Sequence, residues 1–306
     1  MTDTPAGKGL LAGLAAYIMW GLFPLYLRPL HAVGTFEVIA QRVTWSCVLI
    51  LLWMLATKQL DKLRATLTNP ALLWRLCLSA SLITVNWLMY VYAVANGHVL
   101  EASLGYFINP LLNVLLGVVI LSERLNPAQW ASVALAAVAV LYLALIAGHP
   151  PWISLTVATS FGLYGLVRKV IAVEALPGLA VETLLLAPLA AGYLLWLEAS
   201  GAGAMGHSAL TIDALLVGSG AITALPLFLF AYGARLIPFS TMGLLQYIAP
   251  SLQMVLGLMV FGESLDHNRA VGFALIWSAL AIYVADGLWR ARARSRTGAQ
   301  FLPREM

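Results

Sequence analysis

Ten long apolar runs constrain this sequence more than any other feature. A helix that crosses a bilayer needs about 20 mostly apolar residues, and the runs lie at residues 9–28, 34–57, 71–95, 99–121, 127–147, 151–170, 177–197, 211–234, 238–261 and 267–288. Each run is continuous, whereas strands of a membrane barrel alternate over about ten residues. The sequence therefore predicts an all-α integral membrane protein with ten transmembrane helices.

The composition excludes other broad classes. Apolar residues make up 61% of the chain and charged residues 10%, against about 45–50% and about 25% in soluble domains. A water-soluble enzyme and a disordered chain are both excluded by these values. Cys47 and Cys77 lie within apolar runs and predict no disulfide framework. The five histidines are scattered near the ends of runs without ligand spacing, so we expect no metal site and no cofactor.

Positive charges are distributed unevenly over the loops. With the N-terminus inside, only Arg28 and Arg269 fall in outer loops, while thirteen Lys and Arg fall in cytoplasmic segments. The cytoplasmic set is Lys8, Lys58, Lys62, Arg64, Arg124, Arg168, Lys169, Arg235, Arg290, Arg292, Arg294, Arg296 and Arg304. This bias predicts that both termini are cytoplasmic, with residues 1–8 as a short N-terminal tail and residues 289–306 as a basic C-terminal tail. The net charge of +4 is explained by this placement and does not indicate nucleic-acid binding.

The two halves of the chain match each other. When the sequence is shifted by 140 residues, three identical pairs align: Pro110 with Pro250, Gly117 with Gly257, and Glu123 with Glu263. Five spans per copy is an odd number, so the second copy must enter the membrane from the opposite side. We therefore expect two inverted five-helix repeats, at residues 9–147 and 151–288. Secondary transporters commonly have this architecture, with a substrate site near the midplane between the halves.

Sequence motifs along almost the whole chain carry a resemblance to a known family. They lie at Gln41 to Ser46, Asn86-Trp87, Glu101 to Leu111, Ser160-Phe161, Tyr164-Gly165, Arg168-Lys169, Glu182-Thr183, Thr223 to Leu227 and Gln246 to Ser251. With these motifs the chain resembles the drug/metabolite transporter superfamily, EamA type, and within it the RarD branch. The resemblance implies a ten-span permease of the bacterial inner membrane and an association with chloramphenicol sensitivity. It implies a class of transporter and not a particular substrate.

Polar and aromatic side chains inside the runs are candidates for substrate binding. The predicted residues are Tyr17, Trp20, Asn86, Tyr90, Tyr106, Asn109, Tyr164, Gln246, Tyr247 and Gln253. Steps of three and four place Tyr106, Asn109 and Asn113 on one helical face, and the repeat superposes that face on Gln246 and Gln253. The hypothesis is a cavity with amide walls and aromatic sides, suited to a flat small organic molecule. The alternatives are hydrogen bonds between helices for the amides, and packing or an interfacial belt for the aromatic residues.

Charged residues inside membrane spans cost about 2.5–3.5 kcal/mol each at the helix centre, so each is a functional hypothesis. Glu37, Arg42 and Glu182 are the candidates for ion coupling or gating. Arg42 needs a partner on another helix or an anion in a cavity. The two glutamates could instead reach lipid headgroups from positions near the ends of their spans. Glu123 and Glu263 follow span ends and are expected to cap helices and to pair with loop cations, for example Arg124 and Arg269.

The sequence thus predicts a secondary transporter of small organic molecules, amino-acid-like or chloramphenicol-like, that works by alternating access. The expected partners are that small molecule, membrane lipids and protons as a coupling ion, with no nucleic acid. The alternative is an integral membrane enzyme acting on a lipid or isoprenoid. The chain contains no phosphate-binding loop and no G-x-S-x-G or H-E-x-x-H motif, so we expect no enzymatic activity.

The charge bias generates a test of topology. Alkaline phosphatase is active only outside the inner membrane and green fluorescent protein only inside it. Fused at the C-terminus, the fluorescent protein should be active, and inserted in the 200–206 loop, the phosphatase should be active. A C-terminus on the periplasmic side would contradict the ten-span arrangement.

Overall fold

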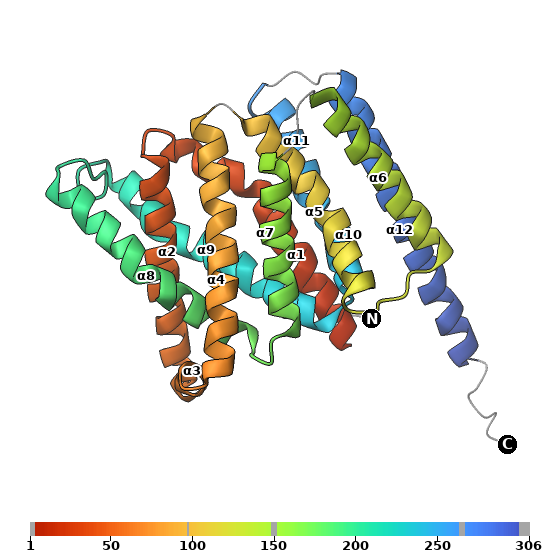
Figure 1. Cartoon of the computed structure of the whole chain (residues 1–306), viewed down its shortest axis with the longest axis horizontal. Coiled ribbons are helices and arrows are strands. Elements are labelled where there is room, and N and C mark those ends of the chain that lie inside the picture. Colours follow the sequence, from red (N-terminus) through yellow and green to blue (C-terminus); the bar gives the residue numbers. More distant parts are fainter. Residues whose placement is uncertain (1–3, 97, 148–151, 263–266, 300–306) are drawn as a thin grey trace.

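The computed structural model describes residues 4–96, 98–147, 152–262 and 267–299, and this part of the chain is helical without a strand (Figure 1). The elements are α1 (Pro5–Leu27), η1 (Arg28–Leu30), α2 (Thr35–Ala56), α3 (Leu60–Leu67), α4 (Pro70–Ala95), α5 (Val99–Val119), α6 (Pro127–Ala147), α7 (Trp152–Val170), α8 (Ala175–Ala199), α9 (Leu210–Leu236), α10 (Phe239–Leu245), α11 (Ile248–Met259) and α12 (His267–Ala299).

Each of the ten predicted runs falls on a helix, and the ninth falls on two, α10 and α11. Among the described residues, eight helical segments are long and apolar enough to cross a membrane, and Leu104–Val119 of α5 is a shorter apolar helix. An all-helical membrane protein is thereby confirmed, while the number ten remains a prediction. α12 runs to Ala299, so the first part of the predicted C-terminal tail continues the last helix.

The predicted proline pair has two different local structures. Pro110 lies inside the continuous helix α5, whereas Pro250 lies in the first turn of α11, just after the break between α10 and α11. Proline has no N–H to donate, which costs nothing in the first turn of a helix but removes one hydrogen bond in the interior, as at Pro110. The chain resolves this at Pro250 by starting a new helix at Ile248.

The principal helix contacts cross from one half of the chain to the other. α1 packs on α9 and on α11, and correspondingly α4 and α5 pack on α7. α2 contacts both α8 and α9, and α4 also contacts α8. The remaining large contacts pair α5 with α10 and α6 with α12. Most of these pairs have a counterpart in the other half. The contact of α1 with α9 corresponds to that of α7 with α4, and the contact of α2 with α9 corresponds to that of α8 with α4.

The outer surface of the bundle is apolar. Leu145, Leu189 and Leu195 are each more than 70% exposed, on α6 and α8. Side chains of this kind are stable next to lipid tails, where water is absent. Figure 1 shows the first turn of α1, the short α3 and the last turns of α12 toward the same edge of the bundle.

The contact between α2 and α9 is close enough to require glycine. A Cβ atom built on Gly220 would lie 2.4 Å from the backbone carbon of Trp45, and Ser46 donates a hydrogen bond to the Gly220 carbonyl at 3.0 Å. Backbone atoms cannot rotate away as a side chain can, so Gly220→Ala must separate the two helices. We expect a loss of about 1–3 kcal/mol, which is typical of overpacking, measured by thermal unfolding in detergent.

Gly192→Ala is the matched control, because nothing lies within 4 Å of a Cβ atom at Gly192 in α8. Alanine favours a helix over glycine by about 1 kcal/mol, so this variant should be as stable as the parent or slightly more. Equal stability of the two variants would contradict the close contact of α2 with α9.

Candidate functional site

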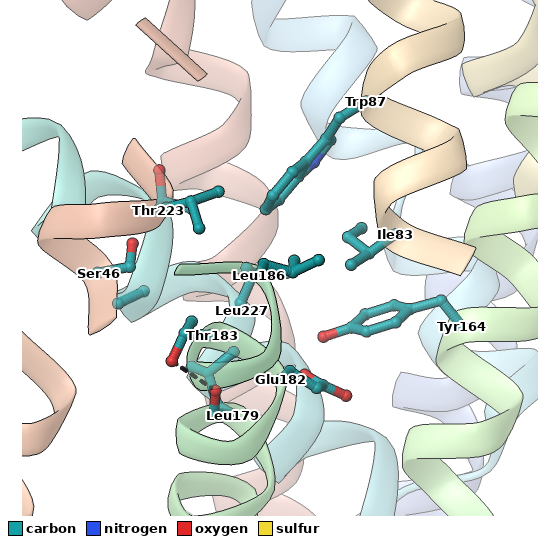
Figure 2. Close-up of a pocket in the computed structure, with 12 residues that line it drawn as sticks. Ser46, Ile83, Trp87, Tyr164, Leu179, Glu182, Thr183, Leu186, Thr223 and Leu227 are labelled. Carbon is teal, nitrogen blue, oxygen red and sulfur yellow. Dashed lines mark hydrogen bonds between the residues drawn. The ribbon is translucent and has the colours of Figure 1, made fainter. Parts of the chain in front are cut away.

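A pocket lies in the interior between α2, α4, α7, α8 and α9 (Figure 2). Its lining residues are Val43, Ser46, Ile83, Trp87, Tyr164, Leu179, Glu182, Thr183, Leu186, Thr223, Ala224 and Leu227. Two of the contributing helices come from the first half of the chain and three from the second. The volume is about 20 Å³, enough for about one water molecule. Any molecule larger than water can therefore enter only if the surrounding helices separate.

An aromatic cluster lies beside this pocket. Tyr164 stacks on Phe230 with ring centres 6.1 Å apart, and Figure 2 shows the Tyr164 hydroxyl pointing into the pocket. Tyr17 and Trp20 complete the cluster at 6.2 and 5.8 Å from Phe230. The structure thus brings together three of the predicted aromatic residues around a phenylalanine that the sequence analysis did not select. Phe230 could have been found, because the repeat places it opposite Tyr90.

A buried ion pair closes one end of the pocket. The Arg168 Nη1 lies 3.6 Å from the Glu182 Oε1, and both side chains are at most 3% exposed. Ser79 donates a hydrogen bond to the same carboxylate oxygen at 2.5 Å, and Arg168 Nη2 donates to the Ala175 carbonyl at 3.0 Å. A Cβ atom on Gly178 would lie 2.1 Å from Arg168 Nη1, so a larger residue at this position would displace the guanidinium.

This pair corrects one assignment made from the sequence. Arg168 is not a cytoplasmic loop residue, because it lies in the last turns of α7 and is 1% exposed. The physical reason is Glu182 on α8, which supplies the countercharge that burial requires. The remaining cations of the cytoplasmic set still outnumber Arg28 and Arg269.

Polar contacts near the same end tie the two halves together. Glu123 accepts hydrogen bonds from the backbone N–H groups of Phe239 and Ser240, at 2.5 and 2.9 Å, and so caps α10. Lys169 lies 4.0 Å from Glu123 and donates to the Ala234 carbonyl at 2.8 Å. The predicted capping role of Glu123 is thus confirmed, with α10 as the capped helix. Glu263 and Arg304 lie outside the described residues.

Arg42 lies at the other end of the pocket, on α2. Its Nε donates a hydrogen bond to Thr223 at 2.8 Å, and its guanidinium carbon is 5.5 Å from the Trp87 ring centre. Thr223 and Trp87 both line the pocket and lie on the side away from Glu182 in Figure 2. The Phe23 ring is 4.7 Å from the same carbon. Arg42 forms no ion pair with any described carboxylate.

The predicted amides form hydrogen bonds between helices and do not line the pocket. Asn109 donates to the Ala158 carbonyl at 2.7 Å. Asn113 donates to Asn109 and to Gln246, both at 3.0 Å. Asn86 donates to the Val157 carbonyl at 2.8 Å. Through these contacts α4 and α5 are both linked to α7, and α5 is also linked to the end of α10. Hydrogen bonding between helices is the alternative role that the sequence analysis gave for the amides.

The other predicted residues do not line the pocket either. Gln253 donates to the Trp20 carbonyl at 3.1 Å, and Tyr247 donates to the Phe107 carbonyl at 3.2 Å. The rings of Tyr90 and Tyr106 are 6.2 Å apart, and both hydroxyls lie close enough to Arg42 to interact with its charge.

Glu37 lies in the first turn of α2 and holds a loop. Its carboxylate accepts the backbone N–H groups of Ala204 and Met205, at 2.8 and 3.4 Å, between α8 and α9. Glu37 is 4% exposed and does not line the pocket. The sequence grouped Glu37 with Glu182, but in the structure only Glu182 reaches the pocket.

Comparison with known proteins gives consistent matches. The profile of the EamA-like transporter family matches residues 7–145. A protein named RarD from Streptomyces exfoliatus is 46% identical over 94% of this chain and 91% of its own length. An uncharacterized transporter of Pseudomonas aeruginosa is 46% identical over 94% of this chain and 96% of its own. A crystal structure of 21% identity has the same fold, with a TM-score of 0.68 over 90% of this chain and 96% of that one.

The buried ion pair generates a stability prediction. Glu182→Leu leaves Arg168 buried without a countercharge, and we expect a loss of about 3–5 kcal/mol, measured by thermal unfolding in detergent. Changing Arg168→Leu in the same chain removes the unpaired charge and should recover most of that loss. Glu174→Gln breaks an exposed pair with Lys62 and should have little effect. A double variant as unstable as Glu182→Leu alone would contradict the pairing.

Proposed function

Because the chain belongs to the EamA-like transporter family, and within it to the RarD-type proteins, we propose that it is a secondary transporter that moves small organic molecules by alternating access. The observation that carries the proposal is the pocket, which lies inside the bundle and is lined by helices of both halves. Its walls combine aromatic rings, four hydroxyl groups and a buried carboxylate. The EamA-like transporter family and the relatives named as transporters point to a transporter rather than to an enzyme.

Two inverted repeats, at residues 9–147 and 151–288, are part of the proposal. The helix contacts support it, because α1 contacts α9 as α4 contacts α7, and α1 contacts α11 as α5 contacts α7. A two-fold axis between the halves would produce contacts that correspond in this way. An odd number of spans per half would then orient the halves oppositely. Rocking one half against the other would open the pocket first to one side and then to the other.

The placement in the cell is proposed from the charges. We place the protein in the bacterial inner membrane with both termini in the cytoplasm, as the bias of Lys and Arg indicates. The Arg168–Glu182 pair and the Glu123–Lys169 contacts then lie near the cytoplasmic side. In that orientation they form the cytoplasmic closure of the pocket. Protons are the proposed coupling ion, with Glu182 as the residue of the pocket that can carry one.

The aromatic wall has a direct role in the proposal. Trp87 and Tyr164 line the pocket from α4 and α7, one from each half. A flat organic molecule that enters when the helices separate would stack against these rings. Stacking of this kind contributes about 0.5–1.5 kcal/mol beyond the burial of apolar area.

The test is transport by the purified protein in proteoliposomes. Uptake and efflux of a panel of amino acids and amphipathic drugs, chloramphenicol included, should be measured with and without a pH gradient. We expect at least one compound to move faster than in protein-free liposomes, and we expect Trp87→Ala to lower that rate about ten-fold. Trp196→Ala is the control, because Trp196 is 61% exposed on the outer face of α8. No transport by the parent protein would contradict the proposal, and equal rates for the two variants would remove Trp87 from the site.

A further inference from the structure

Arg42 is an interior cation that forms no ion pair with any carboxylate whose side chain the structure describes. The other interior arginine, Arg168, is paired with Glu182. The carboxylate of Glu37 is bound to loop N–H groups, and that of Glu123 caps α10. The titratable groups that face Arg42 are the hydroxyls of Tyr90 and Tyr106, and neither carries a charge at neutral pH.

The surroundings hold the Arg42 guanidinium in place without using all of it. Thr223 fixes Nε, and the rings of Phe23 and Trp87 lie at cation–π distance. The two terminal nitrogens, Nη1 and Nη2, donate no hydrogen bond to any residue in the described ranges. Neither terminal nitrogen is fully buried, in contrast to Nη1 of Arg168, and the Arg42 side chain as a whole is half-buried. One edge of the guanidinium is therefore free and reachable.

A free guanidinium edge matches a carboxylate, because its two parallel N–H groups meet the two oxygens. We propose that Arg42 binds the carboxylate of a monoanionic substrate whose flat apolar part lies along Trp87 toward the pocket. This inference rests on the proposed function and names the substrate class of that site. A single unpaired cation balances one negative charge, which favours a monoanion over a phosphate dianion. Glu182 is already engaged by Arg168 and Ser79, so an ammonium group on the substrate is not required.

The experiment compares carboxylates with their uncharged amides. The probes are 3-phenylpropionate with 3-phenylpropionamide, and indole-3-acetate with indole-3-acetamide. Binding to the purified full-length protein in detergent is measured by calorimetry and by the shift of the unfolding temperature. We expect a carboxylate to bind the parent protein about 10- to 100-fold more tightly than its amide, as a charge-assisted hydrogen-bonded pair provides.

The variants assign that preference to Arg42. Arg42→Gln should bind the carboxylate and the amide with affinities within about two-fold of each other, while Arg42→Lys should keep part of the preference because it keeps the charge. If Arg42→Gln does not fold, Thr223→Ala releases Nε and should lower the preference by itself. Arg28→Gln is the matched control, since Arg28 also lies over an aromatic ring, that of Phe261, 5.5 Å away at the surface.

Equal binding of carboxylates and amides by the parent protein would overturn the inference, as would a preference that survives in Arg42→Gln. Each result is separable from the proposed function, which is decided by transport. Transport of uncharged compounds such as chloramphenicol with no effect of Arg42→Gln would leave a transporter without a carboxylate site. Carboxylate binding through Arg42 without transport of any compound would support the binding site and contradict the proposed transport function.

Discussion

The hydrocarbon core of a membrane contains no water, so interior polar groups must find hydrogen-bond partners within the protein. This constraint decides where the interior polar side chains lie. Asn109 and Asn86 reach across to backbone carbonyls of α7, and Asn113 joins α5 to Gln246. Arg168 is buried because Glu182 is buried beside it. Breaking such a pair costs far more than forming it contributes, since the remaining charge has no other partner. These contacts hold the helices together where apolar packing against lipid would not distinguish one neighbour from another.

The same constraint makes the two ends of the pocket unequal. At the end near α7 and α8, the charges are paired and the helix contacts are closed by hydrogen bonds to backbone groups. At the other end Arg42 is held by Thr223 and aromatic rings, with its terminal nitrogens free. A closed pocket with one paired and one unpaired arginine suits a protein that admits a charged molecule and then moves its helices around that molecule. In the proposed mechanism, the corresponding contacts of the two halves, α1 with α9 and α4 with α7, would exchange roles as the pocket opens to one side and then to the other.

Much of this could be predicted from the sequence, and the failures have physical reasons. The length of the apolar runs fixes the helices, so their positions followed directly. Tyr17, Trp20 and Tyr164 were predicted as aromatic residues of one site, and all three pack against Phe230. Helical periodicity shows which side chains share a face but not what that face meets, so Asn109 was expected at a cavity and instead bonds to a carbonyl. Arg168 was misplaced because a cation near the end of a run reads as a loop cation until its partner on the next helix is known.

Alternating access is tested most directly by labelling a cysteine placed in the pocket. Ser46→Cys, in a chain with Cys47→Ser and Cys77→Ser, puts the only thiol on the pocket wall between the halves. A membrane-impermeant thiol reagent is applied to right-side-out and to inside-out vesicles, and the rate of modification is followed. If the helices separate toward each side in turn, the thiol should react from both sides, slowly in each case because the pocket is closed in this structure. Reaction from one side only would contradict alternating access through this pocket.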